Sequence, residues 1–255
     1  MPVRLTNRDE RMLAKLVPAR WLTTRQVRRL FFAEASLSAA RRRLRKLAGA
    51  RYLRTYREHR MAETLYTLGP KGEVVLEEKG LDFRREQTPR RQLAHFVGVN
   101  DLRIAVERSS TPVVYFFAAW ELASLGWAYH VIPDAVFALD GGKRRTFLAE
   151  YDRSNEPVHD FAKKLRCYQG GLQGFPFDGV LVLTKTQGRI VSLRRHLLRH
   201  NLPLGRFVAI PVAEILDGDL WQKPFTDLGD CAAEPAAVYL ADIGPRKCSH
   251  KVFSR

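Results

Sequence analysis

Three carboxylates fall on two neighbouring predicted strands, and one carboxylate from each strand could hold a metal ion together. Asp134 lies near the start of a predicted strand over residues 131–139, and Glu150 and Asp152 lie two residues apart near the end of the next one, 145–151. Because side chains alternate between the two faces of a strand, Glu150 and Asp152 share a face. Carboxylates gathered in this way are typical ligands of hard divalent ions such as Mg²⁺.

The turn between these strands decides which carboxylates face each other. Residues 140–143, Asp-Gly-Gly-Lys, are typical of a hairpin turn. If the hairpin closes there, Asp134 falls opposite or nearly opposite Glu150, with Cβ atoms about 5 Å apart. Two like charges so placed destabilise a sheet unless a cation lies between them, so the pair predicts a Mg²⁺ or Mn²⁺ site. In the alternative, one carboxylate faces solvent at a strand end and pairs with Arg145 or Arg153.

The elements that must position these residues alternate between helix and strand signals from residue 92 onward. The apolar patterns predict a helix over 93–108, strands over 113–118, 131–139 and 145–151, a helix over 157–168, a strand over 179–184, a basic helix over 189–200 and a strand over 206–210. That order implies a mixed α/β sheet in a domain spanning 93–215. Residues 216–255 lose this periodicity and are expected to form a peripheral tail.

Positive charge is concentrated in the first part of the chain. The chain has 255 residues and a net charge of +16, and residues 1–92 alone carry 23 Lys and Arg against 10 Asp and Glu. A compact module with this surplus repels itself unless a polyanion supplies counter-charge, and nucleic acid is the abundant polyanion of a cell. In the alternative, the surplus is only a solvated basic face.

The predicted helix over 36–47 carries the highest density of cations. Its apolar positions Leu37, Ala40, Leu44 and Leu47 cluster on one side. The opposite side carries small side chains at its N-terminal end and cationic side chains beyond it. This pattern suits a helix that enters the major groove of DNA. The candidate DNA-binding residues are Ser38, Arg41, Arg42, Arg45 and Lys46 on this helix and Arg60 in the polar loop that follows it.

Two more helices precede this one, and a hairpin follows it. Thr23 and Gln26 have the spacing of a capping box at the start of the second helix. Two β-prone stretches over 51–57 and 64–68 predict a hairpin wing, and a short helix is expected over 73–79.

Residues 5–80 resemble the winged helix-turn-helix DNA-binding fold, and the run Tyr-Thr-Leu-Gly-Pro-Lys-Gly over 66–72 is the most specific part of the likeness. The resemblance implies a DNA-binding domain over residues 1–80. In the alternative, such a domain makes only protein contacts. Residues 81–92, which are rich in arginine, are expected to form a charged linker.

The second module carries a further set of motifs. These are Pro133-Asp134, Glu150-Tyr151-Asp152, the run Lys-Leu-Arg-Cys-Tyr over 164–168, and His95. The set resembles the PD-(D/E)xK nuclease core, a restriction-endonuclease-like fold. With the winged helix in front, the chain over about residues 5–210 is similar to the replication-relaxation proteins of plasmids and integrative elements.

The nuclease resemblance implies roles for individual residues. In that superfamily the aspartate and glutamate bind the metal, and a lysine two residues after the glutamate helps to activate the attacking water. Here Asp152 occupies the lysine position, Lys164 is the nearest substitute, and Tyr168 lies on the same helix face. Without an equivalent base, the fold binds DNA but cleaves it poorly or not at all. The candidate catalytic residues are Asp134, Glu150, Asp152, Lys164 and Tyr168, with Asp134 and Glu150 as metal ligands.

The charge pattern, the motifs and the resemblances to these families together imply two alternative functions. The first is a double-stranded DNA-binding protein of a mobile element, acting in plasmid replication or transfer, whose Mg²⁺-dependent endonuclease-like domain nicks DNA. The second is a non-catalytic transcriptional or replication regulator with a degenerate nuclease-like domain, and plasmid replication or transfer proteins are expected partners of either. The longest apolar run, 113–120, is too short to span a membrane, so a cytoplasmic protein is expected.

Overall fold

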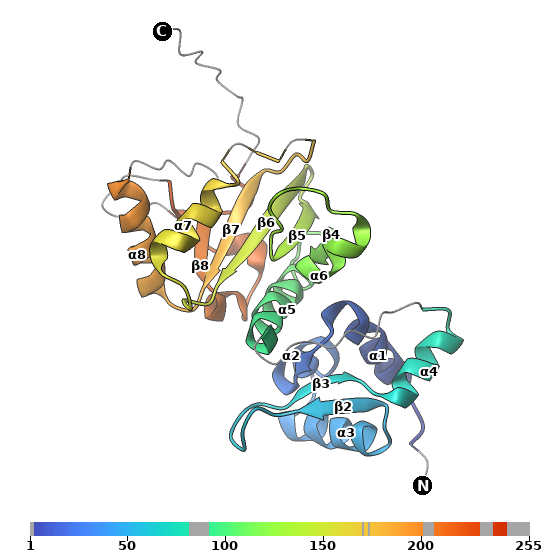
Figure 1. Ribbon diagram of the computed structural model, residues 1–255. Coiled ribbons are helices and arrows are strands. Elements are labelled where there is room, and N and C mark those ends of the chain that lie inside the picture. Colours follow the sequence, from blue (N-terminus) through green and yellow to red (C-terminus); the bar gives the residue numbers. More distant parts are fainter. Residues whose placement is uncertain are drawn as a thin grey trace, which may run out of the picture. The chain divides into compact units, whose positions relative to one another are not determined.

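The computed structural model describes residues 3–81, 92–169, 171–172, 174–200, 207–229 and 237–243. Contacts divide the chain into two compact units, residues 1–104 (unit 1) and residues 105–255 (unit 2). Figure 1 shows the elements of both units. Almost all of the predicted linker at 81–92 lies outside the described residues. In the part of the chain that is described, no helix is both long and apolar enough to cross a membrane.

Unit 1 begins with three helices, as the sequence predicts. These elements and the short strand among them are α1 (Asn7–Ala19), β1 (Leu22–Thr23), α2 (Thr24–Phe31) and α3 (Leu37–Gly49). The predicted capping box of α2 is present, because the Thr23 hydroxyl accepts from the Gln26 amide at 3.1 Å and the Gln26 side chain accepts from the Thr23 amide at 2.9 Å. Helix α3 has a simpler cap, in which the Ser36 hydroxyl accepts from the Ala39 amide at 3.2 Å.

A three-stranded antiparallel sheet follows α3. Strands β2 (Leu53–Tyr56) and β3 (Leu65–Leu68) form a hairpin, and β1 pairs with β3, giving the order β1-β3-β2. Gly69 joins the sheet to α4 (Pro70–Glu78), and a Cβ atom there would lie 2.5 Å from a backbone carbonyl oxygen, so this position requires glycine. Helix α4 begins three residues earlier than expected because Pro70 is favourable in the first turn of a helix.

One apolar core joins these elements. Buried leucines come from α1, α3, β2 and α4, among them Leu13, Leu44, Leu47, Leu53 and Leu76. Because Ala40, Leu44 and Leu47 of α3 point into this core, the other face of α3 remains exposed, as the helical periodicity predicts.

Helix α5 (Leu93–Glu107) contributes most of its length to unit 1. The Asn100 amide nitrogen donates to the carbonyls of Ala19 and Trp21, both at 2.8 Å. The Gln26 amide nitrogen donates to Asp101 at 3.0 Å. Burial raises the pKa of Asp101 to about 6. The sequence analysis predicted the domain boundary at 81–92, whereas the contacts divide the chain after residue 104. The reason is that polar side chains of α5 form hydrogen bonds with the carbonyls at the end of α1 and with the side chain of Gln26.

Unit 2 is built on a mixed seven-stranded sheet with the order β10-β9-β8-β7-β6-β5-β4. Its strands are β4 (Val113–Ala118), β5 (Ala135–Asp140), β6 (Arg144–Asp152), β7 (Gly179–Thr184), β8 (Phe207–Pro211), β9 (Phe225–Asp227) and β10 (Ala237–Val238). Strands β6, β7 and β8 run parallel, and the other neighbours pair antiparallel. The molecule is therefore α/β with a mixed sheet.

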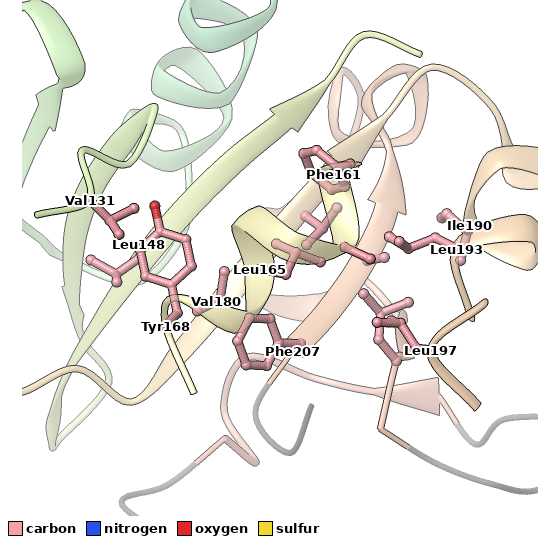
Figure 2. Packing of buried hydrophobic residues seen from close by; sticks show 14 of the residues in the cluster. Val131, Leu148, Phe161, Leu165, Tyr168, Val180, Ile190, Leu193, Leu197 and Phe207 are labelled. Carbon is pink, nitrogen blue, oxygen red and sulfur yellow. The ribbon is translucent and has the colours of Figure 1, made fainter. Parts of the chain in front are cut away.

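Two helices connect the parallel strands and cover one face of the sheet (Figure 1). They are α7 (Val158–Arg166) and α8 (Gln187–Arg199). Figure 2 shows their apolar side chains packed against Leu148, Val180 and Phe207 of the sheet. The shorter helical segments are α6 (Ala119–Leu122), η2 (Ala123–Leu125), η3 (Val212–Ile215) and η4 (Leu220–Gln222).

The chain beyond residue 216 differs from the expected peripheral tail. Strand β9 pairs with β8 and strand β10 pairs with β9, so both belong to the sheet. Phe225 and Leu228 are buried. These strands are two or three residues long, too short to show the alternation from which a strand is recognised in a sequence.

Candidate functional site

The exposed face of α3 is cationic and holds five of the six predicted DNA-binding residues. These are Ser38, Arg41, Arg42, Arg45 and Lys46, and all five are exposed. The sixth, Arg60, is exposed in the loop between β2 and β3. Among the described residues, Arg54 and Arg57 on or next to β2 are also exposed. The alternating pattern of the hairpin was the signal that could have added Arg54 to the predicted set.

Arg43 is the one arginine of α3 that turns inward, and sequence reasoning assigned it no role. Its Nε donates to the buried carboxylate of Asp9 at 3.0 Å, and its Nη2 contacts the same carboxylate and donates to the Arg4 carbonyl at 2.9 Å. Burial alone raises the pKa of Asp9, but hydrogen bonds from Arg43 and Thr6 bring it below its usual value. This ion pair therefore fixes α3 against α1.

In unit 2 the structure brings together four of the five predicted catalytic residues. The last pair in the β5–β6 register is Ala135 with Ala149, so Asp134 and Glu150 occupy the next opposed positions. The Lys164 ammonium contacts Glu150 and lies 3.9 Å from the Asp134 carboxylate. The Tyr168 hydroxyl donates to the other oxygen of Glu150. Lys164 lies on α7, and Tyr168 follows the helix in a turn, which places both over the end of β6.

The electrostatics of this cluster, Asp134, Glu150, Lys164 and Tyr168, are dominated by burial. Glu150 has no exposed surface. Burial, and after it the nearby charge of Asp134, raises the pKa of Glu150 to about 8. Asp134 is half-buried, and its second oxygen accepts from the Tyr151 amide at 2.8 Å. The Lys164 ammonium therefore lies close to two carboxylates at this end of the hairpin.

Tyr168 is a hydrogen-bond donor in this cluster. Its side chain is buried among apolar residues of α7 and the sheet (Figure 2). Burial, with the neighbouring Glu150, raises the pKa of the phenol far above its usual value. The neutral hydroxyl can orient Glu150, but a buried phenol that keeps its proton is a poor nucleophile.

Asp152 is not part of the cluster, although it shares a strand face with Glu150. Its two oxygens accept from Arg189 of α8, with Nε at 2.5 Å and Nη2 at 3.2 Å. Arg189 also donates to the Glu156 carbonyl at 2.9 Å, and the Ser154 amide donates to Asp152 at 2.7 Å. Asp152, the residue that the nuclease resemblance places at the lysine position, is therefore neutralised by Arg189. From the sequence, Arg189 was recognised only as the first residue of a basic helix.

The cluster offers two carboxylates to a divalent ion. In the described part of the chain, no group of three or more His, Cys, Asp or Glu side chains is close enough to hold a metal. Mg²⁺ often keeps several waters and uses one or two protein carboxylates together with substrate phosphates. Asp134 and Glu150 fit that minimal requirement, provided that Lys164 gives up its contact with Glu150.

The sequence matches a known protein family. The sequence model of a protein family described as Replication-relaxation matches residues 13–174, which is more than half of the chain. The matched region includes α2, α3, the hairpin, and the cluster of Asp134, Glu150, Lys164 and Tyr168. No curated protein and no solved structure matches the chain.

Proposed function

Since the chain belongs to the replication-relaxation family, we propose that it binds double-stranded DNA in the replication or relaxation of a mobile element, with α3 of unit 1 as the groove-reading helix. The observation that carries this proposal is the cationic exposed face of α3. Arg41, Arg42, Arg45 and Lys46 are all exposed on one helix whose other face is anchored in the core.

The order of elements in unit 1 supports the same proposal. Helix, strand, helix, helix and hairpin, with the sheet order β1-β3-β2, are consistent with a winged helix-turn-helix. In that arrangement the third helix enters the major groove, and arginines reach guanines or phosphates. The hairpin arginines, Arg54, Arg57 and Arg60, would then lie on the wing and contact the backbone or the adjacent groove.

A mobility-shift titration of the full chain on duplex DNA tests the proposal. Replacing Arg42 and Arg45 together by Ala should weaken binding by roughly 1–3 kcal/mol per lost base contact, and by less if they touch only phosphates. The matched control replaces Lys71 and Lys143 together by Ala. Both residues are exposed and lie outside α3 and the β2–β3 hairpin. If both double variants bind as tightly as the wild type, α3 is not the DNA-binding element.

A second candidate function, Mg²⁺- or Mn²⁺-dependent nicking of DNA, is favoured by one observation. Lys164 lies close to both Asp134 and Glu150. A lysine that replaces the missing motif lysine would need this position. A divalent ion bound by the two carboxylates would polarise a phosphodiester and lower the pKa of a bound water. Lys164 would then orient the attacking water or stabilise the developing negative charge, and Tyr168 would hold Glu150 in place.

The alternative to nicking is a regulator whose unit 2 is no longer catalytic. The Asp152–Arg189 pair favours this alternative. Asp152 stands where the nuclease motif has a lysine, and its charge is neutralised by Arg189, so this position supplies no catalytic base. Incubating supercoiled DNA with the protein and Mg²⁺ or Mn²⁺ separates the two. Nicking that is lost in both Asp134→Asn and Lys164→Ala assigns the chemistry to the cluster. Nicking that survives both changes excludes it, and the absence of nicking in the wild type supports the regulator.

A further inference from the structure

A small pocket opens beside α3 in unit 1, and four cations line it. Arg8 comes from α1, and Arg42, Arg43 and Lys46 come from α3. The pocket has a volume of about 220 Å³. This is smaller than the roughly 300–1,000 Å³ of pockets that enclose a drug-sized ligand, so its size fits a compact group.

The rest of the pocket lining is apolar. It consists of Phe32 and two small residues, Ala35 and Ala39. The Arg8 guanidinium carbon lies 4.0 Å from the centroid of the Phe32 ring, and Phe32 is buried. Stacking on a buried ring restricts the guanidinium, so less conformational entropy is lost when it binds an anion.

The charge of the pocket is not balanced from within. Of its four cations, Arg43 is compensated by the buried Asp9. Among the residues that the structure describes, Arg8, Arg42 and Lys46 have no acidic partner, and the lining contains no Asp or Glu. Three uncompensated cationic side chains therefore line a pocket whose size fits one compact anionic group. The guanidinium group of an arginine forms bidentate hydrogen bonds with phosphate oxygens, and the ammonium group of a lysine adds a point charge.

We propose that this pocket binds one phosphate of the DNA backbone and so sets the position at which α3 enters the groove. The inference rests on the proposed DNA-binding function and adds Arg8 and Phe32 to its machinery. Phosphate contacts fix register and orientation on a duplex, whereas base contacts supply sequence preference. A phosphate held by Arg8 on α1 would clamp the backbone beside α3, and Arg42 and Lys46 would face the same phosphate from the helix itself.

The test measures the affinity of the full chain for a short duplex at several salt concentrations. Arg8→Gln should lower the slope of log affinity against log salt by about 0.9, the value expected for one lost phosphate contact. The affinity at 0.1 M salt should fall roughly five- to tenfold, by a similar factor on duplexes of different sequence. Lys71→Gln removes the same charge from an exposed site outside the pocket and should leave the slope unchanged. Arg8→Lys should keep the slope but lose affinity, since it retains the charge without the fork.

The outcomes separate this inference from the proposed function. If the wild type does not bind duplex DNA, the proposed function fails and the inference fails with it. If the wild type binds but Arg8→Gln behaves like Lys71→Gln, only the pocket assignment is wrong. A separate experiment measures the melting temperature of the protein with inorganic phosphate and with a deoxymononucleotide. Stabilisation that is lost in Arg8→Gln, with DNA affinity unchanged, would show a pocket for a free phosphate compound and would also overturn the backbone assignment.

Discussion

The ammonium group of Lys164 contacts the carboxyl group of Glu150, which has no exposed surface. The hydroxyl of Tyr168 donates to the same carboxyl group. Burying an acid is costly unless its charge is compensated or removed by a proton. Here both means are available, because a lysine lies against Glu150 and because burial raises the pKa of Glu150 to about 8.

This raised pKa makes the stability of the protein depend on pH. The pKa of Glu150 is 4.5 at its ordinary value and about 8 in the folded chain, so between these values the folded state binds more protons than the unfolded state. The free energy of unfolding therefore falls as the pH rises through this window, by up to about 1.4 kcal/mol per pH unit. Glu150→Gln removes the titrating group, so its stability relative to the wild type should increase from pH 5 to pH 8.

Urea unfolding at several pH values measures this difference. Glu78→Gln, an exposed acid at the end of α4, is the control and should follow the wild type at every pH. A stability difference between Glu150→Gln and the wild type that stays constant from pH 5 to pH 8 would contradict the raised pKa.

The hairpin that carries Asp134 and Glu150 could be predicted because its signals are local. Residues 140–143 contain a turn, and the Gly142 amide donates to the Asp140 side chain at 3.1 Å, so the register follows from the length of the turn. Lys164 could be predicted because the helix that carries it starts a few residues after β6. The cap of α2 and the exposed face of α3 also depend on residues close together in the sequence.

The parts that the sequence did not predict depend on contacts between distant segments. Asp152 pairs with Arg189, and Asp9 pairs with Arg43, across 37 and 34 residues. Nothing in the spacing of a single sequence selects one arginine among many as the partner of a given acid. The contacts of α5 with the rest of unit 1 were missed for the same reason, because Asn100 donates to a carbonyl 81 residues away.

The pair of Asp152 and Arg189 should contribute strongly to the stability of unit 2. Asp152 is buried and the Arg189 side chain is 12% exposed, so Arg189→Ala would leave a buried carboxylate without its partner. Such losses cost roughly 3–5 kcal/mol. Asp152→Asn in the Arg189→Ala background should recover part of the loss, with a coupling energy of roughly 0.5–3 kcal/mol. Arg195→Ala, an exposed arginine on the same helix, should change stability by less than about 0.5 kcal/mol. Additive effects of the two changes in chemical denaturation would contradict this coupling.

Metal binding at Asp134 and Glu150 should appear as a thermal shift. An ion that binds only the folded state at ten times its Kd stabilises by about 1.4 kcal/mol, which raises the Tm by roughly 3–6 °C for a unit of this size. Asp134→Asn should abolish the shift with Mg²⁺ or Mn²⁺, whereas Asp140→Asn, at the exposed end of β5, should keep it. If Asp134 acts only as a partner of Lys164, the wild type will show no metal shift, and Asp134→Asn will simply lower the Tm.

Asn100 should stabilise unit 1 by tying α5 to the end of α1. Its side chain is fully buried and donates to the carbonyls of Ala19 and Trp21, both at 2.8 Å. Asn100→Ala leaves these two carbonyls without that donor, so the free energy of unfolding should fall by roughly 1–3 kcal/mol. Asn7→Ala, an exposed position at the start of α1, is the matched control and should cost much less. Hydrogen exchange of the backbone amides of α1 and β1 should become faster in Asn100→Ala only. Unchanged exchange and an unchanged Tm in Asn100→Ala would show that α5 is not a structural part of unit 1.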